Sequence, residues 1–217
     1  MNKNKMIRIT ALLLLLMAIA AVTVSAAAAA NMQVTKSDVY EFDPFPVPGE
    51  QVSQAQAILM TDEAGARLRL KSADLTPGDA VTIWWVIFNQ PEACAAYPTG
   101  TCGLDDLANP DVAAEITYAT GNVINRYGKA RFSAQLEVGH TAQEWFGNGF
   151  TNPTGAEIHV VVHSHGQVIP ELLDDMIGTF RGGCRDDEMI TPEHPAYEDG
   201  TPGPNQCVDL QFAVFQQ

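Results

Sequence analysis

The segment Ile158-His-Val-Val-Val-His-Ser-His165 alternates aliphatic side chains with histidines over most of its length. On an extended strand, residues of equal parity share one face, so the three histidines point to one side and the aliphatic residues to the other. The aliphatic side must be the core side, which leaves the imidazoles on the less buried face. We therefore predict a strand over residues 156–165 within a half-buried sheet.

The same period of two recurs along the chain. In residues 66–72, Leu68 and Leu70 alternate with three cations, and in 207–215 the pattern predicts Val208, Leu210, Phe212 and Val214 on the core face. Residues 80–88 are apolar on both faces, which is typical of a central strand covered on both sides. The predicted strands are 57–61, 66–72, 80–88, 115–119, 121–125, 129–138, 156–165 and 207–215.

Only Pro170 to Phe180 predicts a helix, with Pro at its first position and Gly178 as a stop. Short strands separated by turn signals, without a βαβ rhythm, indicate an antiparallel sheet structure. The predicted fold class is therefore all-β, an antiparallel β-sandwich of immunoglobulin-like type with one short helix.

The amino terminus has the features of an export signal. Lys3, Lys5 and Arg8 precede an apolar stretch from Ala11 to Val24, and Val24-Ser-Ala26 is a small-residue cleavage site. An uncleaved membrane anchor is the alternative. We predict a signal peptide over 1–30, a Pro-rich extended arm over 31–56, and the sandwich domain over 57–217, secreted or periplasmic and without a transmembrane segment after cleavage.

The charge balance disfavours one class of partner. The chain carries a net charge of −14, and −17 without residues 1–30, because that segment holds three of the twelve Lys and Arg and no Asp or Glu. Nucleic-acid binding needs basic patches that displace counterions, and the longest basic pattern is Arg67-x-Arg69-x-Lys71. We therefore expect no nucleic-acid partner and an acidic, well-solvated surface.

Four cysteines allow three pairings, and export favours disulfides. Cys94 and Cys102 bracket a short turn-forming segment, and Cys184 and Cys207 bracket a polar one. We expect the disulfides Cys94–Cys102 and Cys184–Cys207. A four-cysteine zinc site is the competing interpretation, but the spacings contain no C-x2-C unit.

The histidines suggest a second function, metal binding. His163 and His165 lie about 7 Å apart along one strand face, so both can reach one zinc or copper ion. His159 lies some 13 Å from His163 and needs a bulge to join them. His140, Glu157 and His194 are the other candidates for a third ligand. The alternative interpretation, which we favour here, is that no cofactor binds and that these histidines form hydrogen bonds within the strand.

Other candidate sites are weaker. Trp145, between Gly139 and Gly149, is the candidate for an exposed aromatic that stacks on sugars, although core packing is more common for Trp. The acidic loop around Asp186-Asp187-Glu188 lacks the spacing of a calcium loop. Ser164 faces away from its histidine neighbours, and no Gly-x-Ser-x-Gly elbow occurs. We find no complete catalytic set and do not expect an enzyme.

Three segments carry a resemblance, namely Leu75-Thr-Pro-Gly-Asp79 with the following Trp84-Trp85 strand, Gly155-Ala-Glu-Ile-His159, and the ending Gly182-Gly-Cys184 with Cys207-Val-Asp209. Over about residues 66–215 the chain resembles a group of exported bacterial and archaeal proteins without an assigned activity. The Gly155 segment is also similar to part of CHRD domains, which are secreted β-sandwiches. The resemblance implies export and a CHRD-like sandwich. The leading hypothesis is a secreted, non-enzymatic protein with a binding or envelope-associated role, and the alternative is a zinc or copper protein.

Overall fold

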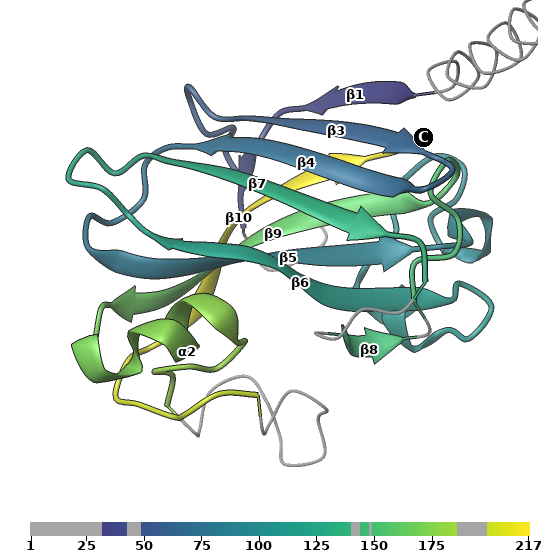
Figure 1. Cartoon of the computed structure of the whole chain (residues 1–217). Helices are drawn as coiled ribbons and strands as arrows, with labels where there is room; N and C mark the ends of the chain where they lie inside the picture. Colours follow the sequence, from purple (N-terminus) through teal and green to yellow (C-terminus); the bar gives the residue numbers. More distant parts are fainter. Residues whose placement is uncertain (1–31, 43–48, 140–143, 148, 186–198) are drawn as a thin grey trace, which may run out of the picture. The chain divides into compact units, whose positions relative to one another are not determined.

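The computed structural model describes residues 32–42, 49–139, 144–147, 149–185 and 199–217. The predicted signal peptide lies outside these residues. Two antiparallel sheets pack face to face (Figure 1), which confirms the predicted β-sandwich. Within the described part of the chain, no helix is long and apolar enough to cross a membrane.

The smaller sheet has four strands in the order β1-β3-β4-β7. Its strands are β1 (Gln33–Ser37), β3 (Gln56–Asp62), β4 (Gly65–Ser72) and β7 (Ala130–Glu137). Every neighbouring pair is antiparallel. Strand β4 follows the predicted alternation, because Leu68 and Leu70 are buried and the three cations between and beside them are exposed.

The larger sheet has six strands in the order β2-β10-β9-β5-β6-β8. Its strands are β2 (Tyr40–Glu41), β5 (Asp79–Phe88), β6 (Ala114–Val123), β8 (Glu144–Gly147), β9 (Glu157–Gln167) and β10 (Val208–Phe215). Strand β6 joins two segments that the sequence predicted separately, and β8 was not predicted. Strands β9 and β5 lie at the centre of the sheet. For β5 this was predicted from its apolar sequence.

The segment predicted as an extended arm contributes to both sheets. Residues Gln33–Ser37 pair with β3, and Tyr40–Glu41 pair with β10. The sandwich therefore begins at Gln33 rather than at Ala57. Residues 43–48 of the segment lie outside the described residues.

The main core lies between the two sheets and includes Leu59, Leu68, Ile83, Trp85 and Ile158. Each of these side chains is at most 1% exposed. Burying one such side chain contributes about 1.5–3 kcal/mol to folding, so this layer supplies the main stabilisation of the sandwich.

The outer face of the six-stranded sheet is covered as well. A 3-10 turn (Pro170–Leu172) leads into α2 (Leu173–Gly178), which contacts β5 and β6 (Figure 1). Gly121 of β6 permits the close approach, because a Cβ at this position would lie 2.0 Å from the carbonyl oxygen of Ile177. The predicted helix over 170–180 thus forms, in two short parts, and covers the sheet.

Two disulfides, Cys94–Cys102 and Cys184–Cys207, confirm the predicted pairing. The first closes a loop that also holds two 3-10 turns, Pro91–Ala93 and Leu104–Ala108, at its borders. The second joins the segment after α2 to the residue before β10. The first therefore closes a local loop, and the second fastens an irregular segment to the end of β10.

The predicted core face of the last strand is wrong after Leu210, which itself packs against the core. A register shift between Asp209 and Gln211 reverses the parity of β10, so Ala213 and Phe215 enter the core between the sheets. Phe212 instead packs against Tyr40, with 6.1 Å between the ring centroids. A bulge of this kind adds one unpaired residue to the strand, and a simple alternation rule does not detect it.

Candidate functional site

The three histidines of β9 share one face of the strand, opposite the core residues Ile158, Val160 and Val162. The expectation that this face is the less buried one is wrong. His159, His163 and His165 are 3%, 1% and 0% exposed. Residues after α2 cover one end of that face, since Phe180 stacks on His163 and Gly182 bonds to His165. His159, at the other end, lies against Phe88. The strand pattern alone could not show this cover.

His165 belongs to a chain of hydrogen bonds in which the donor and the acceptor of each bond can be assigned. The indole N–H of Trp84 donates to Thr82 Oγ1 at 2.9 Å, and Thr82 donates its hydroxyl hydrogen to His165 Nε2 at 2.9 Å. His165 Nδ1–H then donates to the carbonyl oxygen of Gly182, also at 2.9 Å. Because an indole N–H only donates and a carbonyl only accepts, this chain fixes the neutral tautomer with its hydrogen on Nδ1.

Burial and the neighbouring His163 lower the pKa of His165 to about 3, although its bond to Gly182 acts in the opposite direction. The imidazole of His165 is therefore neutral at physiological pH. A neutral imidazole can serve as a metal ligand and does not require a counter-ion.

His163 has one hydrogen-bond partner and one free nitrogen. Its Nδ1–H donates to Asp209 Oδ1 on the neighbouring strand at 2.7 Å. The ring stacks on Phe180 at 4.7 Å between centroids and meets the His165 ring edge to face. His163 Nε2 is buried and has no hydrogen-bond partner among the described residues. With the hydrogen on Nδ1, the lone pair is on this free nitrogen.

His159 belongs to a different network. Its Nε2 bonds to Glu157 Oε1 at 2.7 Å, and the same oxygen accepts the backbone N–H of Cys102 at 2.7 Å. Glu157 Oε2 accepts from Gln216 Nε2. His159 and Glu157, both candidate ligands in the sequence, thus connect the first disulfide loop to the sheet.

The structure brings His163 and His165 together with Cys184 and Cys207. One potential ligand atom from each of the four lies within 4.8 Å of the others. His165 Nδ1 is 3.6 Å from Cys184 Sγ. His159 is not in this group, and the sequence did not indicate the two cysteines as its members, because it predicted only their disulfide.

The remaining predicted residues are not members of this group. His140, His194 and the acidic residues 186–188 lie outside the described residues. Trp145 lies in β8, but its side chain is not among those described. Ser164 donates to Asp79 Oδ2 at 3.2 Å and accepts the backbone N–H of Gly166, which gives it a structural role.

A second candidate site lies on the outer face of the four-stranded sheet. The strand register places five exposed cations on this face, which we call the basic face: Lys36, Arg67, Arg69, Lys71 and Arg131. The sequence identified only the three on β4. Lys36 and Arg131 join them because β1 and β7 belong to the same sheet.

The cations of β4 and β7 have no acidic partner. Among the described residues, no carboxylate forms an ion pair with Arg67, Arg69, Lys71 or Arg131. Lys71 and Arg131 are directly opposite each other in the β4–β7 register. Like charges in this position destabilise a sheet. This face also carries two acidic residues, Asp62 and Glu137. Both pair with Gly65, the first residue of β4, and so lie at one end of the sheet.

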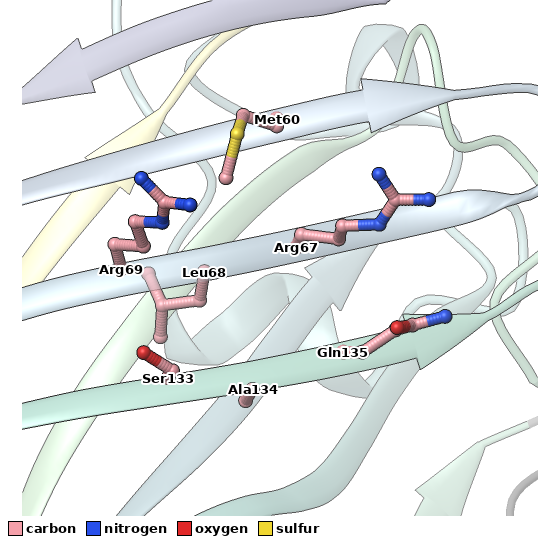
Figure 2. A pocket seen from close by; sticks show the side chains of 7 residues that line it. All are labelled: Met60, Arg67, Leu68, Arg69, Ser133, Ala134 and Gln135. Atoms are coloured by element: carbon pink, nitrogen blue, oxygen red, sulfur yellow. The ribbon is translucent and has the colours of Figure 1, made fainter.

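Part of the basic face is hollowed. A shallow depression of about 390 Å³ is lined by Met60, Arg67, Leu68, Arg69, Ser133, Ala134 and Gln135. Figure 2 shows Arg67 and Arg69 along β4, with Met60 from β3 on one side and Ser133 and Gln135 from β7 on the other. The lining combines guanidinium donors with neutral polar groups and one flexible apolar side chain.

Comparison with protein-family models and with curated proteins gives no match. Among solved structures, the chain is similar to the Cu/Zn superoxide dismutase from Brucella abortus at a TM-score of 0.35 and 13% identity. The alignment covers 85% of this chain and 100% of that one. The predicted similarity to exported proteins and to CHRD domains stays a prediction.

Proposed function

We propose that the protein is a non-enzymatic, secreted or periplasmic β-sandwich that binds acidic polysaccharides through its basic face. Two disulfides in the described structure are compatible with a location outside the cytoplasm. The binding role rests chiefly on one observation. In a chain of net charge −14, one sheet carries several cations that have no acidic partner among the described residues.

The cation pattern has a cost in the free protein. Lys71 and Arg131 repel each other across the strands, and nearby acidic side chains could have compensated them in a chain with 26 Asp and Glu. An anionic ligand removes this repulsion. We therefore infer that the cations serve binding rather than stability.

The spacing favours an extended, repeating ligand. Successive cations on β4 lie about 7 Å apart, because alternate residues of a strand face the same side. Guanidinium groups bind carboxylate and sulfate oxygens with paired hydrogen bonds. A linear glycan with carboxylate or sulfate groups matches both the row of charges and the compartment that we propose.

Single-stranded nucleic acid fits this face less well. Its binding sites combine basic grooves with aromatic side chains on which bases stack. The outward residues of the four strands include no aromatic side chain; the apolar ones are Val34, Ile58 and Met60. This composition supports a glycan rather than a nucleic acid.

Calorimetric titration of the oxidised protein with heparin and with polygalacturonate tests the proposal. We expect binding of both that weakens as salt increases, and no binding of neutral dextran. Arg67→Gln/Arg69→Gln should weaken binding by about tenfold, at roughly 0.7 kcal/mol for each exposed cation. The control Arg126→Gln/Arg185→Gln removes two charges outside the strands and should bind as the wild type does.

Three results would contradict the proposal. They are no binding of either acidic glycan at low salt, an equal loss in the control variant, and tighter binding of single-stranded DNA or of anionic vesicles than of both glycans. The last result would assign the basic face to a different class of partner.

A further inference from the structure

We infer that reduction of the Cys184–Cys207 disulfide converts its surroundings into a zinc site with the ligands His163, His165, Cys184 and Cys207. This inference is independent of the proposed glycan binding, because it concerns the outer face of the other sheet. In this zinc site the two cysteines take the place of His159, which the sequence suggested as a further ligand.

The four residues come from separate parts of the chain. His163 and His165 are in β9, Cys184 follows α2, and Cys207 immediately precedes β10. All four are at most 4% exposed, and their ligand atoms are within 4.8 Å of one another. Two thiolates and two imidazoles are a common tetrahedral ligand set for zinc.

His163 is already oriented as a metal ligand. In metal sites, a ligating imidazole usually donates its other N–H to a carboxylate, which fixes the tautomer and makes the ring more basic. The Nδ1–H of His163 donates to Asp209 in this way, and its Nε2 is buried and has no partner in the described part of the chain. An unsatisfied buried nitrogen costs free energy, which binding of an ion recovers.

His165 can join after a small change. Its Nδ1, 3.6 Å from Cys184 Sγ, becomes the ligand atom when its hydrogen moves to Nε2. Thr82 Oγ1 then accepts from Nε2 instead of donating to it, because a hydroxyl can do either. The hydrogen bond to Gly182 is lost, and the hydroxyl hydrogen of Thr82 gives up His165 Nε2 as its acceptor.

The disulfide and the metal exclude each other. A dithiol reductant supplies two electrons and two protons to the Cys184–Cys207 bond and becomes a disulfide itself, leaving two thiols. Zinc then binds as both thiol protons are released, because the thiolate is the ligand form. Reoxidation of the two thiolates would expel the ion. The site thus holds zinc only in the reduced chain.

The other disulfide provides a matched control. Cys94, Cys102 and Asp106 also form a compact group. However, both carboxylate oxygens of Asp106 already accept backbone N–H groups, from Ala95 and Gly103, and the group includes no imidazole. We expect no zinc site there.

Cobalt(II) absorption of the full chain, prepared without an affinity histidine tag, tests the inference. After reduction by a phosphine, we expect one cobalt per chain with thiolate-to-cobalt charge-transfer bands, displaced by one equivalent of zinc. The oxidised chain should show no such bands. Cys94→Ser/Cys102→Ser should retain them, Cys184→Ser/Cys207→Ser should lose them, and His163→Gln should weaken cobalt binding at least tenfold.

Circular dichroism of each sample separates ligand loss from unfolding. The inference is overturned if the reduced, folded chain shows no charge-transfer bands, or if the bands persist without Cys184 and Cys207. It is also overturned if His163→Gln binds as the wild type does, or if the reduced chain loses its near-ultraviolet signal before metal is added. Glycan binding is measured on the oxidised chain, so its outcome is separate.

Discussion

His163 and Asp209 are directly opposed residues of β9 and β10, and their side chains are joined by a hydrogen bond of 2.7 Å. The carboxylate is 18% exposed and the imidazole 2%. Asp209 therefore connects a buried ring to the edge of the covered region, and it satisfies one of the two ring nitrogens.

Replacing Asp209 by Ala leaves the buried Nδ1–H of His163 without an acceptor. We expect the free energy of unfolding to fall by about 1–2 kcal/mol, the usual cost of an unsatisfied buried donor. Urea denaturation of the oxidised protein measures this. Asp111→Ala, which removes an exposed carboxylate, should stay within about 0.5 kcal/mol of the wild type. Equal stability of Asp209→Ala and Asp111→Ala would show that the bond contributes nothing.

The lowered pKa of His165 predicts acid sensitivity. The ordinary histidine pKa is 6.5 and the folded value is about 3, so between these values the unfolded chain binds a proton that the folded chain does not. Stability from this group is complete above pH 6.5 and decreases as the pH falls, by up to about 1.4 kcal/mol per pH unit.

The measurement compares urea denaturation of wild type and His165→Gln, both oxidised and metal-free, from pH 7 to pH 4. Subtracting the two curves removes the contribution of the carboxylates. We expect the wild type to lose stability more steeply than the variant. If the free energies of unfolding of the two proteins fall in parallel with pH, the pKa of His165 is not lowered in the folded protein.

Substitution by Ala should have a large effect on stability at Gly121 and a small one at Gly178. A Cβ on Gly121 would overlap the carbonyl oxygen of Ile177, whereas a Cβ on Gly178 meets nothing within 4 Å. We expect Gly121→Ala to lower the free energy of unfolding by about 2 kcal/mol or more, because α2 must move away. Gly178→Ala should change it by less than about 1 kcal/mol. Thermal unfolding that ranks the two variants equally would argue against the close contact of α2 with β6.

Reversing the charge of Arg131 should raise the stability of the protein and weaken its binding of acidic glycans. Arg131→Glu replaces the like charge opposite Lys71 by an opposite charge and should raise the free energy of unfolding by about 0.5–1 kcal/mol. It should also weaken heparin binding by about tenfold, since a cation of the basic face is reversed. Denaturation and titration of one preparation give both values. Arg126→Glu, in a turn, should change neither, and a variant that binds heparin more tightly would exclude Arg131 from the site.

The longer strands were predictable because each carries its own pattern, whereas the short strands β1, β2 and β8 were not predicted. Leu68 and Leu70 alternate with cations, and Ile158, Val160 and Val162 alternate with other side chains, so local periodicity was enough to assign them. The last strand was predicted as well, but its core face after Leu210 was not, because the bulge near Asp209 depends on its pairing with β9. The candidate sites were only partly predictable, because they also depend on how the strands pair. Arg67, Arg69 and Lys71 are visible as a row, but the register of β7 and β1 adds Arg131 and Lys36.

By itself, the sequence determined the β-sandwich class, the pairing of the cysteines and the common face of three histidines, since these follow from alternation and from short loop closure. Tertiary structure alone decided that those histidines are buried and that His163 bonds to Asp209 while its other nitrogen has no partner among the described residues. It also decided that the imidazoles of His163 and His165 lie beside Cys184 and Cys207. Such contacts join residues that are distant along the chain, and their geometry depends on how sheets, helix and loops pack, which no local pattern contains.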